Sequence, residues 1–324
     1  MNNIILLGHG VGIKLIVETL ENNASTYKVC GVVTHPLPDH RHDLEMLKKR
    51  KGYYTGYGYN VFDVKKDYNI DLLESQDVNN PETAQWVEQY NPKYIISIGC
   101  RNIIKKSFLD KFPNRVLNIH TTPLPRYRGG ANDTWMILNG ETDRLQYGCV
   151  HLVDEHIDTG DIIAKVFYKI PTNIYPIDLF KIRMNTLPEL ITLALNNLES
   201  PHLKPEKQSV DEGTTFPRLH SARDGRIDFQ KFTGESLLKF IYAFGYPFEG
   251  AFCFLGEKKI NILEAEFYTD KIFHPFADGL IFGKNEKNEY KVSIRGGYLL
   301  IKKIELDGLP VEQNQIFRLG RILS

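Results

Sequence analysis

The sequence has no long apolar run and no excess of charge of one sign. A transmembrane helix needs about 18 consecutive apolar residues, and no such run occurs in the 324 residues. Lysine and arginine together number 40, as do aspartate and glutamate. The chain as a whole therefore lacks the positive field that attracts a protein to phosphate backbones. These absences disfavour a membrane-spanning protein and make a nucleic-acid partner a weaker candidate.

The four cysteines are too widely scattered for a CxxC redox or metal motif; they are Cys30, Cys100, Cys149 and Cys253. The amino-terminal sequence MNNIILLGHGVG enters an apolar run without a basic leader, so it predicts a first strand and not a secretion signal. We therefore expect reduced thiols in a cytoplasmic protein. A histidine-rich stretch has irregular ligand spacing and indicates a solvated loop, so no metal site is predicted; its residues are His35, Asp39, His40, His42 and Asp43.

A chain of this length predicts two domains. In the first half, short β-branched runs alternate with helical stretches, which is typical of an α/β, Rossmann-like, mostly parallel sheet. The predicted strands are 3–7, 28–33, 94–98, 116–119, 146–153 and 162–168, and the predicted helices are 13–22, 81–90 (with Asn80 as N-cap) and 177–198. The polar, proline-containing stretch 199–217 is typical of an interdomain linker. We place a catalytic domain at 1–205 and a smaller domain at 206–324.

The second domain has a different pattern. One helix is predicted at 234–244, followed by short strands at 251–254, 259–267, 290–294 and 298–304. Closely spaced strands with Gly and Asp turns predict a small open β-barrel, similar to an OB-fold.

Two segments of the first domain carry the residues suited to chemistry. The sequence Asn118-Ile-His120-Thr-Thr-Pro-Leu-Pro-Arg-Tyr-Arg-Gly-Gly130 directly follows a predicted strand, where open α/β sheets bind ligands. Strand alternation places Asn118 and His120 on the same face. The second segment, Asp154 to Asp161, supplies carboxylates between two predicted strands. These groups suit acyl transfer to nitrogen: Asn118 can donate to a developing oxyanion, His120 can move protons, and Asp158 can orient His120 or accept the proton of the amine.

The two segments together resemble the signature of the formyltransferase family that uses 10-formyltetrahydrofolate. The matching motifs are NIHTTPLPRYRGG and HIDTGDI. The resemblance implies a catalytic trio of Asn118, His120 and Asp158. It also implies that the folate is held by two further sets of residues, one in the loops after the strands (Asn102, Ile103, Ile104, Thr122 and Pro125) and one before Asp158 (Asp154, Glu155, His156 and Ile157).

The resemblance extends into the second domain. FPR at 216–218, DGRIDF at 224–229 and YPFEGAF at 246–252 are similar to the start of the carboxy-terminal barrel in methionyl-tRNA formyltransferases and in an enzyme that formylates a nucleotide-linked aminoarabinose. Gly130 stands where the aminoarabinose enzyme carries an arginine. Contacts of that side chain therefore do not transfer to this chain.

Other interpretations of these segments are weaker. Gly8 to Gly12 follow the first strand, but Ile13 occupies the third glycine position of a dinucleotide fingerprint, which argues against a nicotinamide-dependent oxidoreductase. A protein that binds folate without catalysis is disfavoured because all three catalytic positions are present. The basic run 48–51 predicts an exposed helix end. The tyrosine-rich loop 53–59 fits stacking on a base or sugar as well as it fits packing on its own rings.

Two amines compete as acceptor: an amino-deoxysugar linked to dTDP, UDP or GDP, and the methionine on initiator tRNA. From 211 to 324 there are 16 basic and 16 acidic residues, whereas a domain that grips tRNA needs a basic face. We therefore favour a nucleotide-linked aminosugar, as used in surface-glycan (lipopolysaccharide O-antigen) biosynthesis. The expected product of the folate is tetrahydrofolate. The sequence is compatible with a homodimer.

Overall fold

The computed structural model describes residues 1–22, 26–40, 58–209 and 211–324. Its contacts divide the chain into two compact units, each made of several segments. The first unit consists of Met1–Gly129, Leu145–Lys169 and Lys181–Phe216, and the second consists of Gly130–Arg144, Ile170–Phe180 and Pro217–Ser324. The basic run 48–51, His42, Asp43 and most of the tyrosine-rich loop lie outside the described residues.

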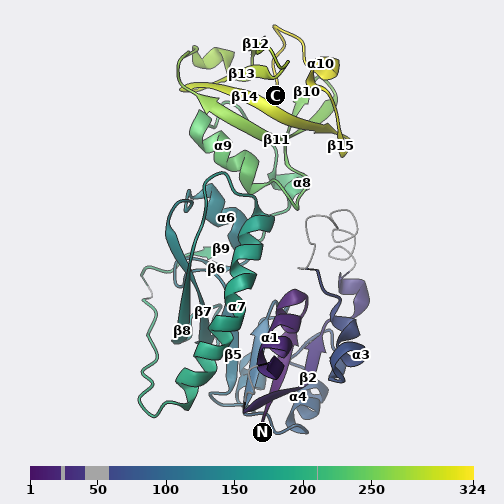
Figure 1. Cartoon of the computed structure of the whole chain (residues 1–324), viewed down its shortest axis with the longest axis vertical. Coiled ribbons are helices and arrows are strands. Elements are labelled where there is room, and N and C mark those ends of the chain that lie inside the picture. Colours follow the sequence, from purple (N-terminus) through teal and green to yellow (C-terminus); the bar gives the residue numbers. More distant parts are fainter. Residues whose placement is uncertain (23–25, 41–57, 210) are drawn as a thin grey trace. The chain divides into compact units, whose positions relative to one another are not determined.

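The first unit contains a seven-stranded sheet, counted over the described residues, with the order β3-β2-β1-β4-β5-β7-β8 (Figure 1). The five strands from β3 to β5 are parallel, and β7 and β8 add an antiparallel edge. The predicted mostly parallel sheet is therefore confirmed. The strands are β1 (Asn2–Gly8), β2 (Tyr27–Thr34), β3 (Asp71–Glu74), β4 (Tyr94–Ile98), β5 (Val116–His120), β7 (Leu145–Leu152) and β8 (Ile162–Lys169).

The helices connect the strands and cover the sheet. Pro81 begins α4 (Pro81–Glu88) after the extended Asn80, as the sequence predicts, although the Asn80 side chain makes no cap hydrogen bond. An apolar cluster lies between one face of the sheet and α4 and α5 (Lys106–Leu109); it includes Ile5, Leu7, Val87, Ile95 and Phe108. The remaining elements along this part of the chain are α1 (Val11–Asn22), η1 (Leu37–His40), η2 (Val61–Asp63), α3 (Val64–Tyr68) and α7 (Pro176–Glu199).

The central strands β1 and β4 are buried along most of their length. Ile4 to Leu7 and the whole of β4 are buried, as expected for parallel strands covered on both faces. A Cβ atom on Gly8 would lie 1.8 Å from the carbonyl oxygen of Ile98, and Gly8 has a φ of +139°. Only glycine permits this approach of β1 to β4. The close packing of β1 against β4 therefore accounts for the glycine at position 8.

The second unit contains a six-stranded antiparallel sheet, again counted over the described residues, with β10, β11, β14, β13 and β12 in line and β15 paired to β14. Its strands are β10 (Ala251–Leu255), β11 (Lys258–Tyr268), β12 (Ile281–Lys284), β13 (Tyr290–Ile294), β14 (Gly297–Leu306) and β15 (Leu309–Pro310). Its helices are α6 (Asn132–Leu138), α8 (Ser221–Asp224), α9 (Gly234–Ala243), η3 (Pro275–Ala277) and α10 (Gln313–Ile316). A capping box between Thr233 and Ser236 begins α9.

Residues 321–324 join the two edges of this sheet. Phe254 of β10 and Ser324 exchange two backbone hydrogen bonds, of 2.9 and 2.6 Å. On the other edge, Ile281 of β12 donates to the carbonyl of Arg321 at 2.9 Å, and Leu323 donates to that of Gly279 at 2.9 Å. The predicted barrel is confirmed, and this segment bridges the gap between its edge strands.

The stretch 199–217, expected to be a linker, is folded onto the first unit up to Phe216. Glu206 pairs with Ile162 at the end of β8. Further along, β9 (Thr215–Phe216) forms a two-stranded parallel ladder with β6 (Arg128–Gly129). Among the described residues, no helix is long and apolar enough to cross a bilayer.

Candidate active site

Asn118 and His120 lie at the end of β5, between β4 and β7. Asn118 is in register with Ser97 of β4 and His151 of β7, and His120 is in register with Cys149. The two side chains leave the strand on the same face, because successive residues alternate. Asp158 comes from the loop between β7 and β8 and has a φ of +54°.

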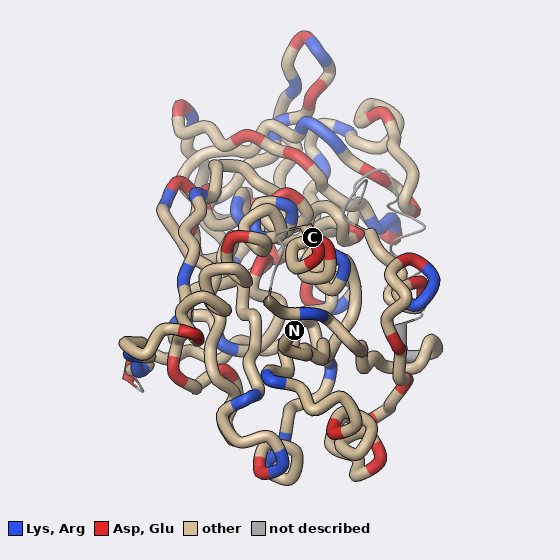
Figure 2. Tube along the Cα trace, turned by 60° about the horizontal axis from the view of Figure 1, so that its bottom comes forward, with Lys and Arg blue, Asp and Glu red and all other residues tan. Residues whose placement is uncertain are grey.

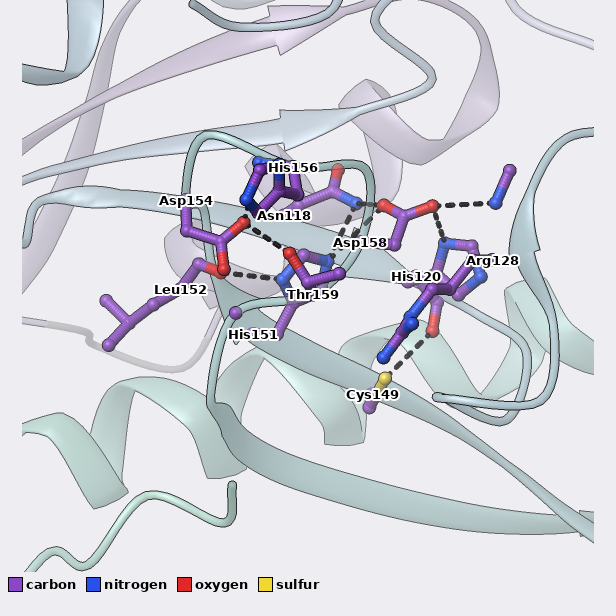
Figure 3. A network of polar contacts seen from close by, with 12 residues as sticks. Asn118, His120, Arg128, Cys149, His151, Leu152, Asp154, His156, Asp158 and Thr159 are labelled. Atoms are coloured by element: carbon purple, nitrogen blue, oxygen red, sulfur yellow. Dashed lines mark hydrogen bonds and ion pairs between the residues drawn. The ribbon is translucent and has the colours of Figure 1, made fainter. Parts of the chain in front are cut away.

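The Asp158 carboxylate lies between Asn118 and His120 (Figure 3). Its Oδ1 accepts a hydrogen bond from Asn118 Nδ2 at 3.2 Å, and its Oδ2 lies 3.6 Å from His120 Nδ1. Oδ2 also accepts a 2.9 Å hydrogen bond from the backbone N–H of Gly129. The structure therefore brings together the three residues that the sequence predicts to be catalytic.

Gly129 can donate to Asp158 because it lacks a side chain. Its φ is +84°, and a Cβ atom there would lie 2.6 Å from the carbonyl oxygen of Phe216 in β9. The neighbouring ring of Tyr127 stacks on that of Phe216, with centroids 5.3 Å apart. Pairing of β6 with β9 thus fixes the loop that supplies the Gly129 N–H.

His120 is buried, and its Nε2 lies 2.5 Å from the carbonyl oxygen of Tyr127. A carbonyl only accepts, so this contact places a proton on Nε2 and leaves Nδ1 facing Asp158. The hydroxyl of Thr122 lies 2.9 Å from the same Nε2. Burial lowers the pKa of His120, and the nearby Asp158 carboxylate opposes that shift. His120 is therefore neutral near pH 7 and can take a proton at Nδ1.

Burial alone would raise the pKa of Asp158, but its neighbours outweigh burial. The N–H of Gly129 and the positively charged forms of His120 and His151 stabilise the carboxylate and hold its pKa well below the ordinary range. Asp158 is therefore ionised at neutral pH.

His151 is the polar member of the site that sequence reasoning missed. It is 2% exposed; its Nδ1 donates to the carbonyl of Leu152 at 2.7 Å, and its Nε2 lies 3.2 Å from Asn118 Nδ2. A histidine inside an apolar strand is more often a core residue, so its type gave no signal. Its register opposite Asn118, which only the sheet pairing reveals, is what identifies it.

The residues predicted to hold a folate fall in loops around this trio. After β4, Asn102 Oδ1 accepts from the Val78 N–H at 3.0 Å and lies 3.0 Å from His35 Nε2. The side-chain oxygen of Asn102 is thus held by contacts with other residues of the protein. Ile103 is 57% exposed, whereas Ile104 is buried in the core. Thr122 is buried beside His120, and Pro125 accepts a backbone hydrogen bond from Thr214.

The residues before Asp158 shape their own loop. Asp154 Oδ1 accepts from the His156 N–H at 3.0 Å and from the Thr159 hydroxyl at 2.6 Å, which forms an Asx-type turn. Glu155 is exposed and lies 3.7 Å from Lys106, at the start of α5. Ile157 is 43% exposed. Within the described part of the chain, no group of three or more His, Cys, Asp or Glu residues is arranged to hold a metal ion.

Comparison with solved structures shows the fold. The chain is similar to an N-formyltransferase from Helicobacter canadensis, solved with folinic acid and dTDP-3-aminofucose, with a TM-score of 0.64 and 17% identity over 94% of this chain and 100% of that one. It is also similar to HypX from Aquifex aeolicus in complex with tetrahydrofolic acid, with a TM-score of 0.56 and 18% identity over 94% of this chain. The matched part is only 44% of the HypX chain.

Comparison of sequences shows the family. A methionyl-tRNA formyltransferase from Rickettsia bellii is 30% identical over 260 residues, which are 80% of this chain and 81% of that protein. The model of the formyl transferase family matches residues 2–175, and that of the formyl transferase carboxy-terminal domain matches residues 220–318. With both family models matched and more than half of its length in the first, the chain belongs to the formyl transferase family, enzymes that transfer a one-carbon group.

Proposed function

We propose that this enzyme moves the formyl group of 10-formyltetrahydrofolate to the primary amine of a nucleotide-linked amino-deoxysugar, in the cytoplasm. The observation that carries the proposal is the Asn118–Asp158–His120 arrangement, in which one ionised carboxylate lies between an amide and a neutral imidazole. This set supplies a hydrogen-bond donor for an oxyanion and two acceptors for protons.

The loops around the trio fit a folate. Ile103 and Ile157 are exposed branched side chains, one in each of the loops assigned to the folate. The ion pair between Lys106 and Glu155, at 3.7 Å, shows that these two loops lie side by side. An aromatic pterin ring is apolar on its faces, so it would cover such side chains favourably. The bound formyl donor supplies the one-carbon unit as an activated amide.

The roles of the trio follow from their contacts. As an amine attacks the formyl carbon, the formyl oxygen gains negative charge, which the Asn118 N–H stabilises, and the neutral His120 can take the amine proton at Nδ1. Both Asn118 Nδ2 hydrogens point at acceptors, His151 Nε2 and Asp158 Oδ1. A carbonyl oxygen entering beside Asn118 therefore replaces or shares one of them. Asp158, ionised at neutral pH, receives the amine proton itself or stabilises the imidazolium that forms when His120 takes it. The carbon–nitrogen bond to the folate then breaks, and this proton passes to the departing folate nitrogen, which leaves as tetrahydrofolate.

Charge and fold favour a sugar over tRNA as acceptor. Between residues 211 and 324, basic and acidic side chains both number 16. Lys, Arg, Asp and Glu are interspersed along the trace (Figure 2), whereas tRNA binding needs a concentrated basic surface. The Helicobacter canadensis enzyme, solved with a dTDP-linked aminosugar, is matched over its whole length. We place the product in surface-glycan assembly, such as that of lipopolysaccharide O-antigen.

A second candidate is formylation of methionyl-tRNA, favoured by the name of the Rickettsia bellii relative and its 30% identity. One assay separates the two. The enzyme is given 10-formyltetrahydrofolate with dTDP-, UDP- and GDP-linked aminosugars, each in a separate reaction, and with charged initiator tRNA, and tetrahydrofolate release is followed. An Asn118→Ala variant serves as the control for background hydrolysis. Turnover with a nucleotide sugar supports the proposal, and turnover with tRNA alone establishes the second candidate.

A further inference from the structure

The side chain of Gln208 joins the two loops that carry the catalytic contacts. Its Nε2 donates to the carbonyl oxygens of Asp158, at 2.9 Å, and Gly160, at 2.8 Å. Its Oε1 accepts from the guanidinium of Arg128 at 3.1 Å. Both amide hydrogens of Gln208 are therefore used on one loop, and its oxygen binds the other.

The backbone around Gln208 is anchored on both sides. We call residues 206–216, apart from residue 210, the strap. At one end, Glu206 and Ile162 exchange two backbone hydrogen bonds of 2.8 and 2.9 Å. Towards the other end, Thr214 donates to the carbonyl of Pro125 at 3.1 Å and accepts from the N–H of Arg128 at 3.0 Å. Gln208 thus reaches the two loops from a fixed position.

Both loops depend on such support. Asp158 has a φ of +54°, a left-handed backbone conformation that residues other than glycine adopt at a cost in free energy. Its carbonyl is one of the two that Gln208 holds. On the other loop, Arg128 lies between two residues that contact the site. The carbonyl of Tyr127 accepts a hydrogen bond from His120, and the N–H of Gly129 donates one to Asp158. Gly213 leaves room for Arg128, because a Cβ atom there would lie 2.1 Å from its Nη1.

We propose that Gln208 is a positioning residue: by holding the Asp158 and Arg128 loops together, it sets the separation of the Asp158 carboxylate from the His120 imidazole. This inference rests on the proposed catalytic roles of those two residues. Gln208 itself acts through Asp158 and needs no contact with a substrate. The side chain of Gln208, in a stretch that the sequence marks only as polar connecting chain, then contributes to the reaction.

The kinetic test compares Gln208→Ala and Gln208→Glu with Glu206→Gln. The glutamate keeps the size of the side chain and its acceptor for Arg128, but it loses both donations to the carbonyls of Asp158 and Gly160. Glu206→Gln is the matched control. Glu206 lies on the same strap, and its substitution removes the 2.6 Å ion pair with Lys165 of β8 without changing a contact of the Asp158 loop. We expect kcat to fall at least tenfold in both Gln208 variants, with KM for donor and acceptor within twofold of wild type, and no such fall in the control.

A second measurement does not need the acceptor. Side-chain ¹⁵N resonances of histidine are recorded in the same variants and assigned with His120→Gln and His151→Gln. We expect the His120 imidazole signals to move in Gln208→Ala and Gln208→Glu but to stay unchanged in Glu206→Gln. Unmoved His120 signals in a folded Gln208 variant overturn the inference, as does an unchanged kcat. If no aminosugar in the panel is turned over, the proposed acceptor fails while the resonances still decide the role of Gln208.

Discussion

The Nδ2 atom of Asn118 lies 3.2 Å from Nε2 of His151, and this contact fixes which way the Asn118 amide faces. His151 Nδ1 is committed as a donor to the carbonyl of Leu152, so Nε2 of the neutral ring can only accept. The Asn118 amide therefore turns its NH₂ group toward His151 and Asp158. A residue outside the predicted trio thus orients one of its members.

Removing that acceptor should slow the reaction without abolishing it. His151→Phe keeps a ring in the buried position but leaves the Asn118 amide without one of its two acceptors. A neutral hydrogen bond contributes about 1 kcal/mol, so we expect kcat to fall about fivefold. His151→Gln, whose side-chain oxygen accepts, should recover part of the loss. Steady-state kinetics checks this, and a His151→Phe enzyme with wild-type kcat would show that the contact has no role.

Asn118→Ala and His120→Ala should each lose at least about 10²-fold in kcat, the typical cost of removing an oxyanion donor. Circular dichroism and thermal denaturation should show that both variants stay folded, because neither residue belongs to the main apolar core. The rate of tetrahydrofolate release is the measurement. Near wild-type rates in either variant would contradict the catalytic assignment.

The imidazole of His120 should titrate below the ordinary histidine pKa of about 6.5, because burial disfavours its charged form. Asp158 stabilises the imidazolium, so Asp158→Asn should lower the pKa of His120 further. Chemical shifts of the labelled ring recorded against pH give both values. A higher pKa in Asp158→Asn than in the wild-type enzyme would mean that the 3.6 Å separation does not couple the two groups.

Ile103→Ala and Ile157→Ala should weaken the binding of the formyl donor and leave kcat unchanged. Each removes apolar surface that we expect the folate to cover, and a loss of about 1.4 kcal/mol would raise KM for 10-formyltetrahydrofolate about tenfold. The matched control is Leu145→Ala, which truncates another exposed apolar side chain of the same unit, 67% exposed and at the start of β7. Equal KM values in all three variants would remove these isoleucines from the folate site.

The sequence predicted the central elements well and the connections poorly. The mostly buried strands β1, β4 and β5 and the helix α7 agree with their predicted positions within two residues. By contrast, the strands β3 and β12 were not predicted, because each has four residues of which at most one is buried, and the helix α6 was not predicted, because its seven residues make less than two full turns. Asn118, His120 and Asp158 came from a motif.

The contacts that hold this trio together were beyond sequence reasoning for a physical reason. His151 faces Asn118 only because β7 pairs with β5 in one particular register. Gln208 lies fifty positions beyond Asp158, in a polar stretch with several prolines. A free linker and a segment packed on a domain can both have this composition. Long-range pairing decides between these outcomes, and no local pattern records it.

Residues 321–324 give the barrel unit a protection that its sheet alone would lack. By hydrogen bonding to Phe254 of β10 and to the neighbourhood of Ile281 of β12, they occupy backbone groups on both outer strands. Exposed strand edges are templates on which separate molecules pair and aggregate. We therefore expect this short segment to limit intermolecular β-sheet growth, because it leaves fewer backbone groups on the outer strands open to another molecule.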